Sequence, residues 1–502
     1  MSEVRTLVQR VMELAESQPD KKAVVFRKNG LTYRELADRA RQTAARLGAM
    51  GIKSGDRVLF SAPSKPETFV LLLGVQYLGA AAVYIDKLST PEHAFAIYDE
   101  VGAPLFLTDM KLKEPCPEQY RLYSVKELLS AESEELPVPE YREPDPEAVA
   151  EILFTSGTTG KPKGVMLSWR AVHQILTNTI RGIGIRPDDV TLMPLPLHHS
   201  LALRECRGVL WQGATLVLQN GFTFAKEVEN NLDQHGCTGF VAVPVSMELL
   251  RGQMQEHFYE ILGRFRYIEI GAGALTVEQR KRLSAHLPDT DLNNTWGSSE
   301  TGGAVFTKVH EIVGSEKTVS TIGRPLDTVE IRILDEENRP IASDAEHPGR
   351  LALRGRMTMS GYWNQPELTA DALQDGWLVT NDLCYADENG YLYMLGRTDD
   401  IINIGGEKLS PLELENVASE CPGLLECACI GVEDKEGSLG QIPVLFAAGD
   451  GTLMEEALRT YFSGRMERYK VPQKYVWLDK IPRNAMQKID RKEIRRMWSE
   501  IG

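Results

Sequence analysis

The chain has 502 residues, of which 42% are apolar and 25% charged, and its 56 Lys and Arg against 71 Asp and Glu give a net charge of −15. This length exceeds what one ordinary core holds and predicts two or more domains, and the near-average composition argues against a disordered or fibrous chain. The acidic balance makes nucleic acid or an anionic membrane surface an unfavourable main partner.

Neither the cysteines nor the apolar stretches indicate export or a membrane. The seven cysteines show no repeated CxxC or Cys/His ligand spacing, which favours reduced thiols in the cytoplasm over disulfides or a metal site. Residues 1–19 lack the continuous apolar core of a secretory signal. Residues 69–85 are the most membrane-like, but Gly74, Gln76 and Gly79 interrupt them, so we expect a buried helix followed by a strand and no transmembrane span.

Residues 22–109 alternate short β-rich runs with longer helical stretches, which is the pattern of an α/β domain. Thr32 before Glu35 is a capping-box signature for a helix that begins at Tyr33. A second series of the same kind includes a helix over residues 169–183. The β-like runs lie at 23–26, 57–61, 81–85 and 105–108, and later at 215–218, 239–243 and 267–270.

The pattern changes towards the C-terminus. Residues 322–394 contain short strands and Gly/Asp turns, and a smaller unit with its own strands and helices begins near Asp399. We therefore expect an α/β protein. Its large N-terminal domain, residues 1–398, would combine doubly wound sheets with a β-rich segment, and an α+β domain would occupy residues 399–502.

Residues 152–168, ILFTSGTTGKPKGVMLS, form an apolar run that opens into a loop of glycines, hydroxyls and lysines. Glycines let the backbone approach an anion, hydroxyls donate hydrogen bonds, and lysines supply charge, so the loop predicts a phosphate site. It is not a Walker A loop, because GxxxxGK[ST] cannot be aligned with it. A simple turn is the alternative, but the closing Lys-Pro-Lys-Gly favours phosphate binding. The residues concerned are Thr155, Ser156, Gly157, Thr158, Thr159, Gly160, Lys161, Lys163 and Gly164.

This loop resembles the phosphate loop of the adenylate-forming enzymes, the family that contains acyl-CoA synthetases, luciferases and peptide-synthetase adenylation domains. The resemblance extends from Thr32 through residues 55–58 to Lys488, which is nearly the whole chain. It implies a large ATP-binding domain and a small mobile domain. The small domain would rotate about a hinge that Asp399 resembles.

Two glycine-rich turns follow predicted strands, where a doubly wound sheet binds its ligands. The turn at 271–274 includes Gly273 and Ala274, and residues 296–300 read Trp-Gly-Ser-Ser-Glu. The second resembles the family's aromatic-Gly-x-Thr-Glu signature. The resemblance implies that Trp296 lies against adenine, that Ser299 lies near the α-phosphate, and that Glu300 binds Mg²⁺, with Gly297 also among the residues that bind the nucleotide. An ordinary solvated carboxylate is the alternative for Glu300.

Three further positions match the family's patterns. Asp382 and Arg397 resemble the ribose-contacting pair, although Asn381 stands where the family commonly has glycine. Lys488 resembles the C-terminal lysine that reaches the carboxylate and the α-phosphate, with Gln487 in place of the common glycine. A turn-capping Asp, a surface Arg and a solvated Lys are the ordinary alternatives.

The resemblance also implies where the acid and the thiol bind. His199 resembles the gate or pocket residue of the family, although a core histidine is an equal alternative. Gly405 and Gly406 begin a segment that resembles the lining of the pantetheine channel, and a tight hairpin explains them equally well. The Gly-Gly-Glu form, in a chain with no fused carrier domain, favours free coenzyme A, and the absence of a suitable Asp argues against an amino acid substrate.

Arg204, Glu205 and Arg207 interrupt an otherwise apolar stretch at 201–210. We interpret them as a solvated helix face that carries a local ion pair. A polar acyl substrate or a partner subunit is the alternative explanation.

Together these residues predict an ATP-dependent acid–thiol ligase that converts a fatty or aryl acid to an acyl-adenylate and then to a coenzyme A thioester. Lys488, Lys163, Glu300 and His199 would be catalytic, and ATP, Mg²⁺ and coenzyme A would be the cofactors. Three alternatives remain open. They are a ligase that loads a carrier protein, a light-emitting oxygenase, and a non-catalytic protein that binds ATP without pyrophosphate exchange.

Overall fold

The computed structural model describes residues 4–111, 118–130, 136–155, 163–405, 407–434, 437, 439–449, 454–484 and 488–501. Within these ranges, no helix has both the length and the apolar character to cross a membrane. Residues 69–85 instead belong to the buried helix α3 (Pro66–Tyr77) and the buried strand β4 (Ala81–Ile85), as the interrupted apolar pattern predicts.

The first large sheet has the strand order β17-β8-β7-β4-β3-β5-β6. Strands β3, β4, β5 and β7 run parallel, and β8 returns antiparallel along β7. Because helices cover both faces of a parallel sheet, its strands read as continuous apolar runs, which the sequence had indicated. The bounds are β3 Arg57–Ser61, β5 Leu105–Leu107, β6 Leu122–Tyr123, β7 Val149–Thr155, β8 Lys163–Ser168 and β17 Gly361–Tyr362.

The second large sheet has the order β14-β13-β12-β11-β9-β10-β1-β2, with parallel pairing from β13 to β1 and antiparallel strands at both edges. This topology confirms the predicted α/β class with doubly wound sheets. The bounds are β1 Lys22–Phe26, β2 Asn29–Thr32, β9 Val190–Met193, β10 Thr215–Leu218, β11 Gly239–Ala242, β12 Tyr267–Ile270, β13 Asp291–Ser298 and β14 Gly302–Lys308.

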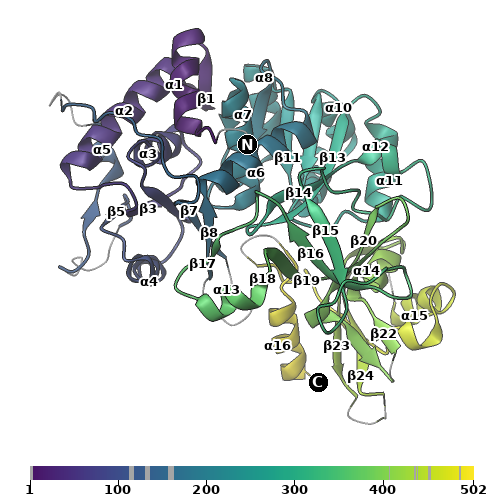
Figure 1. The fold of residues 1–502 in the computed structure, drawn as a ribbon. Helices are drawn as coiled ribbons and strands as arrows, with labels where there is room; N and C mark the ends of the chain where they lie inside the picture. Colours follow the sequence, from purple (N-terminus) through teal and green to yellow (C-terminus); the bar gives the residue numbers. More distant parts are fainter. Residues whose placement is uncertain are drawn as a thin grey trace.

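Helices surround these two sheets (Figure 1). The predicted helix at 33–50 is α2, whose capping box joins Thr32 and Glu35, and the helix at 169–183 is α6 with Ser168 as its N-cap. The bounds are α1 Leu7–Ser17, α2 Tyr33–Ala49, α4 Pro91–Val101, α5 Val125–Ser130, α6 Trp169–Ile183, α7 Ser200–Gln212, α8 Ala225–His235, α9 Pro244–Met254, α10 Phe258–Leu262, α11 Val277–His286 and α12 Val309–Ile312.

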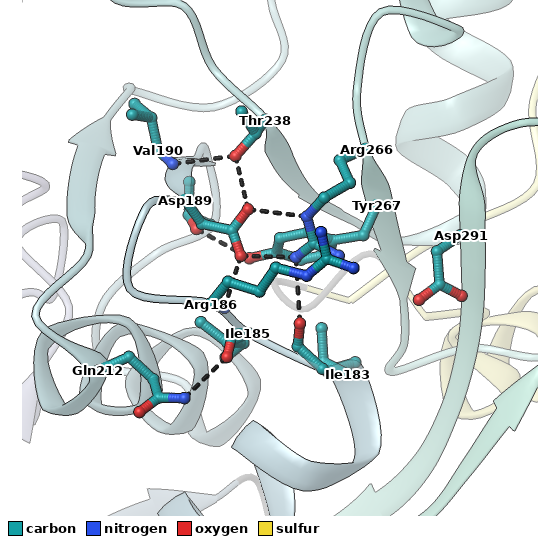
Figure 2. A network of polar contacts seen from close by, with 12 residues as sticks. Ile183, Ile185, Arg186, Asp189, Val190, Gln212, Thr238, Arg266, Tyr267 and Asp291 are labelled. Carbon is teal, nitrogen blue, oxygen red and sulfur yellow. Dashed lines mark hydrogen bonds and ion pairs between the residues drawn. The ribbon is translucent and has the colours of Figure 1, made fainter.

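The amino ends of three neighbouring strands of the second sheet are joined by Asp189, just before β9 (Figure 2). Its carboxylate accepts hydrogen bonds from Thr238 Oγ1 at 2.8 Å and from Arg266 Nε at 2.9 Å. Thr238 and Arg266 directly precede β11 and β12. This charged network fixes the amino ends of the strands. Ligands of such sheets bind at the opposite side, at the carboxyl ends of the strands.

The green and yellow C-terminal parts lie at one end of the molecule (Figure 1). A sheet of β15, β16, β19, β18 and β20 precedes the small unit. This unit contains the two-stranded sheet β21-β22 and the three-stranded sheet β23-β24-β25. The bounds are β15 Glu330–Leu334, β16 Gly349–Arg354, α13 Pro366–Ala372, β18 Leu373–Gln374, β19 Trp377–Ala386, β20 Leu392–Arg397, β21 Ile402–Ile404, β22 Glu407–Leu409, α14 Pro411–Ser419, β23 Leu424–Glu433, β24 Gln441–Gly449, α15 Glu455–Ser463, β25 Lys474–Trp477 and α16 Arg491–Ile501.

Helix α7 corrects the interpretation of its three charged residues as a solvated face. Arg204, Glu205 and Arg207 are 4%, 0% and 2% exposed. Their partners are distant strand residues, because Arg204 pairs with Glu269 of β12 and Arg207 with Glu151 of β7. A buried charge needs such a partner, so these residues tie α7 to both sheets. Both guanidiniums already pair with buried carboxylates, and their burial leaves them out of reach of a partner subunit.

The buried network of α7 contains one more carboxyl group than it contains arginines. Glu205 is the carboxyl group left without an arginine partner. Burial and the neighbouring Glu269 raise the pKa of Glu205 well above its usual value near 4.5, and Tyr267 donates a hydrogen bond to its Oε1 at 3.0 Å. If Glu205 and Glu269 were both ionised, the Oε2 atom of each carboxylate would be buried without a hydrogen-bond donor. A proton on Glu205 provides the donor, so this side chain is a neutral acid in the folded protein.

Replacing Glu205 by glutamine should therefore stabilise the protein. Below about pH 4.5 the Glu205 side chain is neutral in both the folded and the unfolded chain, so the raised pKa costs no stability. As the pH rises, only the unfolded chain ionises, and the free energy of unfolding falls. We expect Glu205→Gln to raise the free energy of unfolding by about 1–3 kcal/mol at pH 8 and by little at pH 5. Urea unfolding at both pH values measures the difference, and an equal effect at both would contradict a neutral Glu205.

Candidate active site

The two predicted glycine turns lie side by side because β12 and β13 are parallel neighbours whose carboxyl ends meet. A Cβ atom on Gly271 would lie 2.7 Å from Thr295 Oγ1 and 3.2 Å from Leu201 of α7, and one on Gly297 would clash with the carbonyl of Gly302. Small residues are required where these backbones approach. The half-buried Trp296 and Ser299 border the same turn, and the exposed Gly273 and Ala274 extend the other.

Lys163 and Glu300 are brought together by a residue that sequence analysis did not select. The Tyr362 hydroxyl donates to Glu300 Oε1 at 2.9 Å, and Lys163 Nζ lies 5.5 Å from the centre of the Tyr362 ring. Burial and the Glu300 carboxylate raise the pKa of Tyr362, so the phenol stays protonated. A Gly-Tyr pair within a β-rich segment carried no chemical signal by itself.

Lys163 also marks one end of the predicted phosphate loop. Thr155 is the last residue of β7 and is the register partner of Lys163, the first residue of β8. The loop therefore begins and ends at one point of the sheet edge. The remaining predicted loop residues, Ser156, Gly157, Thr158, Thr159, Gly160 and Lys161, and also Gly406 and Gln487, lie outside the described residues.

Asp382 and Arg397 face each other across the antiparallel strands β19 and β20. Desolvation raises the pKa of Asp382, and the charges of Arg397 and Lys488 oppose this rise. An acceptor carboxylate beside a forked donor suits a vicinal diol such as ribose. Asn381 donates a hydrogen bond to Asp399 Oδ2 at 3.2 Å, and Arg397 Nη2 lies 3.6 Å from the same oxygen. The unusual asparagine thus contacts the expected hinge.

Lys488 lies close to this group although it belongs to the C-terminal part of the chain. Desolvation lowers the pKa of Lys488 although the residue is exposed, and the nearby Asp382 and Glu300 carboxylates oppose this shift. His199 is close enough for Lys488 to influence its charge. Burial first, and then His198 and Lys488, lower the pKa of His199 to about 3, so its imidazole is neutral near pH 7.

Gly405 is the predicted site residue that the structure does not bring to this group. It forms the turn between β21 and β22 with φ of 61°, a conformation that favours glycine. Its N–H donates to the carbonyl of Leu439 at 2.6 Å, within the same small unit. The hairpin alternative therefore describes its local structure, and its expected place in a thiol channel is left as a prediction.

Residues 11–363 match the sequence family described as AMP-binding enzyme, and residues 413–488 match the AMP-binding enzyme C-terminal domain. The first match alone covers more than half of the chain. The chain belongs to the AMP-binding enzyme family. This membership confirms the resemblance noted from the phosphate loop. The predicted class of AMP-forming acid–thiol ligase is confirmed by the relatives of the chain together with this membership.

Relatives of this AMP-binding enzyme match nearly its full length. The 2-succinylbenzoate–CoA ligase of Bacillus subtilis is 29% identical over 97% of each chain, and that of Bacillus licheniformis is 29% identical over 96% of this chain and 98% of its own. The o-succinylbenzoate CoA synthetase of Bacillus subtilis, solved with its acyl-adenylate intermediate, superposes with a TM-score of 0.85 at 27% identity over 97% of each chain. ATP-bound MatB from Rhodopseudomonas palustris, 23% identical with a TM-score of 0.86 over 98% of this chain and 99% of its own, shares the fold.

The donor set of the AMP-binding enzyme suits magnesium held jointly with ATP. Among the residues that the structure describes, no group of three or more His, Cys, Asp or Glu side chains could hold a metal. Mg²⁺ commonly uses one or two carboxylates and completes its shell with water and substrate phosphates. Glu300 meets that requirement, because the described hydrogen bond of its carboxylate engages Oε1 and leaves Oε2 for a cation.

Proposed function

We propose that this AMP-binding enzyme is a coenzyme A ligase for an aromatic carboxylic acid. Relatives that match nearly the whole chain are 2-succinylbenzoate–CoA ligases, and one related structure contains the corresponding acyl-adenylate. The observation that carries the proposal is the approach of Lys488, from the C-terminal part of the chain, to Asp382, Arg397 and Glu300. This arrangement brings two cations, Lys488 and Arg397, to the place where a carboxylate and a triphosphate would meet.

The reaction has two steps. A carboxylate oxygen of the acid attacks the α-phosphorus of ATP, the bond from that phosphorus to the β-phosphate oxygen breaks, and pyrophosphate leaves. The sulfur of coenzyme A then attacks the carbonyl carbon of the acyl-adenylate, AMP leaves with the electron pair of the carbon–oxygen bond, and the thiol proton passes to solvent. When bound, Mg²⁺ would offset phosphate charge.

The residues of the chain receive roles consistent with their positions. Lys488 would bind the attacking carboxylate and the α-phosphate, and Lys163 would bind the departing phosphates. Asp382 and Arg397 would hold the ribose hydroxyls, with Trp296 against adenine and Ser299 near the α-phosphate. His199, neutral at pH 7, would form a polar wall of the acid pocket without adding charge.

The same roles require the small domain to move. We assign residues 1–398 to the nucleotide-binding domain and 399–502 to the mobile domain, with Gly405 lining the thiol channel after rotation about Asp399. The short 3₁₀ turn at Thr398–Asp400, between β20 and β21, supports a hinge at this point. The six cysteines of the described ranges are free thiols, which supports a reducing compartment such as the cytoplasm.

A compact aryl acid suits the region between α7 and the glycine turns better than a long alkyl chain. Thr295 Oγ1, next to Gly271, accepts from Arg204 Nη2 at 3.1 Å and donates to Glu269 Oε1 at 2.9 Å. The buried Arg204–Glu269 pair therefore closes the interior beyond Thr295. An alkyl chain that passed this point would separate two buried charges, which is strongly unfavourable.

A panel of acids tests this assignment. AMP release should require an acid, ATP and Mg²⁺, and thioester formation should require free coenzyme A. We expect 2-succinylbenzoate or a related aryl acid to give a kcat/KM about 10²-fold or more above long-chain fatty acids, since the latter would disrupt the buried pair. Pyrophosphate exchange with no acid, or thioester formation only on a carrier protein, would reject the proposed function.

A further inference from the structure

Tyr362 contacts both charged groups that would act on the phosphates of ATP. Its hydroxyl donates to Glu300 Oε1 at 2.9 Å, and its ring lies 5.5 Å from Lys163 Nζ, within the range of a cation–π interaction. The side chain is only 8% exposed. One buried residue thus links a candidate metal carboxylate to a candidate phosphate-binding cation.

The backbone on both sides of Tyr362 is fixed to the same two segments. Met359 N–H donates to the carbonyl of Glu300 at 2.8 Å, and Trp363 N–H donates to the carbonyl of Gly164, the residue after Lys163, at 2.8 Å. Residues 359–363 therefore form a bridge from the Glu300 turn to the start of β8. This bridge holds Tyr362 between the two charges before any ligand binds.

Gly361 allows the bridge to lie this close to its neighbours. Its φ of 140° is a conformation that L-amino acids with side chains rarely adopt, and a Cβ there would lie 2.6 Å from Thr369 Cγ2. Thr369 Oγ1 accepts a hydrogen bond from the Tyr362 N–H at 2.8 Å. The orientation of the Tyr362 ring is thus determined by packing and by backbone hydrogen bonds.

The geometry points to Tyr362 as a positioning residue for metal-bound ATP. This inference rests on the proposed function, because it takes Glu300 as the metal carboxylate and Lys163 as the phosphate-binding cation. The hydroxyl engages Oε1, so Oε2 would be the oxygen available to hold the metal, and the ring would keep the Lys163 ammonium in place to bind the phosphates. Residues that orient a metal ligand in this way typically change metal affinity or activity about 10- to 100-fold when removed.

Two substitutions separate the functions of the hydroxyl and the ring. Tyr362→Phe keeps the ring beneath Lys163 and removes the donor to Glu300, whereas Tyr362→Leu removes both. Calorimetry would measure the Kd of ATP for each protein with Mg²⁺ and, separately, with EDTA, in the absence of any acid. Tyr391→Phe is the matched control, because the Tyr391 hydroxyl pairs with Arg324, away from these groups.

For Tyr362→Phe we expect the Kd of Mg·ATP to rise about tenfold while the Kd of metal-free ATP changes less than about twofold. Tyr362→Leu should weaken both, and Tyr391→Phe neither. A Tyr362→Phe protein that binds Mg·ATP as the parent does, or that loses metal-free binding equally, overturns the inference. Because no acid is present, an incorrect acid assignment leaves this result unaffected, so the two failures are distinguishable.

Discussion

Replacing Lys488 by alanine should lower the rate of acyl-adenylate formation about 10²- to 10³-fold, which is the usual cost of removing one oriented charge from a transition state. The side chain lies near Glu300, Asp382 and His199, and desolvation in this group lowers its pKa although the residue keeps contact with solvent. Acid-dependent pyrophosphate exchange measures this step. KM for ATP should change much less than kcat, because the ammonium acts mainly on charge that develops in the reaction.

The second step provides a control within the same protein. If the small domain rotates, Lys488 leaves the site before thiol attack, so the Lys488→Ala protein should convert preformed acyl-adenylate to thioester at close to the parent rate. Lys480→Ala, an exposed lysine of the same domain, should affect neither step. Equal losses in both steps would contradict the domain rotation, and no loss in the first would contradict the role of Lys488.

Local sequence signals predicted the individual elements well. Helix α6 begins and ends at the predicted residues 169 and 183, and α2 begins at its predicted capping box. Strands β3 and β4 match the predicted runs because parallel strands covered on both faces must be apolar throughout. These features depend on residues a few positions apart, which a single sequence displays directly.

Contacts between distant residues were not predictable in this way. Arg204 and Glu269 are 65 residues apart, and nothing near either one indicates the other. Tyr362 and Glu300 are 62 residues apart, and the pairing of β17 with β8 together with the backbone hydrogen bond from Met359 to Glu300 brings the tyrosine to the site. The charged residues of α7 were interpreted as solvated because isolated charges usually are. Their burial follows from partners that the tertiary structure supplies.

Replacing Arg207 by methionine should lower the free energy of unfolding by about 3–5 kcal/mol, the usual cost of leaving a buried charge without its partner. Glu151 of β7 is fully buried, and besides Arg207 it accepts hydrogen bonds from Gln76 Nε2 at 3.0 Å and from the Tyr84 hydroxyl. Burial already raises the pKa of Glu151 against the opposing effect of Arg207. Without the guanidinium the pKa should rise further, so the destabilisation should be greater at pH 8 than at pH 6.

Strand β7 leads directly to Thr155 and the phosphate loop, so the loss of this pair should also be detectable at the site. Urea unfolding of Arg207→Met, Glu151→Met and the double variant forms a thermodynamic cycle. Each single variant should be strongly destabilised, whereas the double variant should recover most of the loss, because two apolar side chains of similar volume replace a desolvated ion pair. The parent and double variant should then bind ATP alike. If the double variant is as unstable as the sum of the singles, Arg207 and Glu151 do not act as a pair.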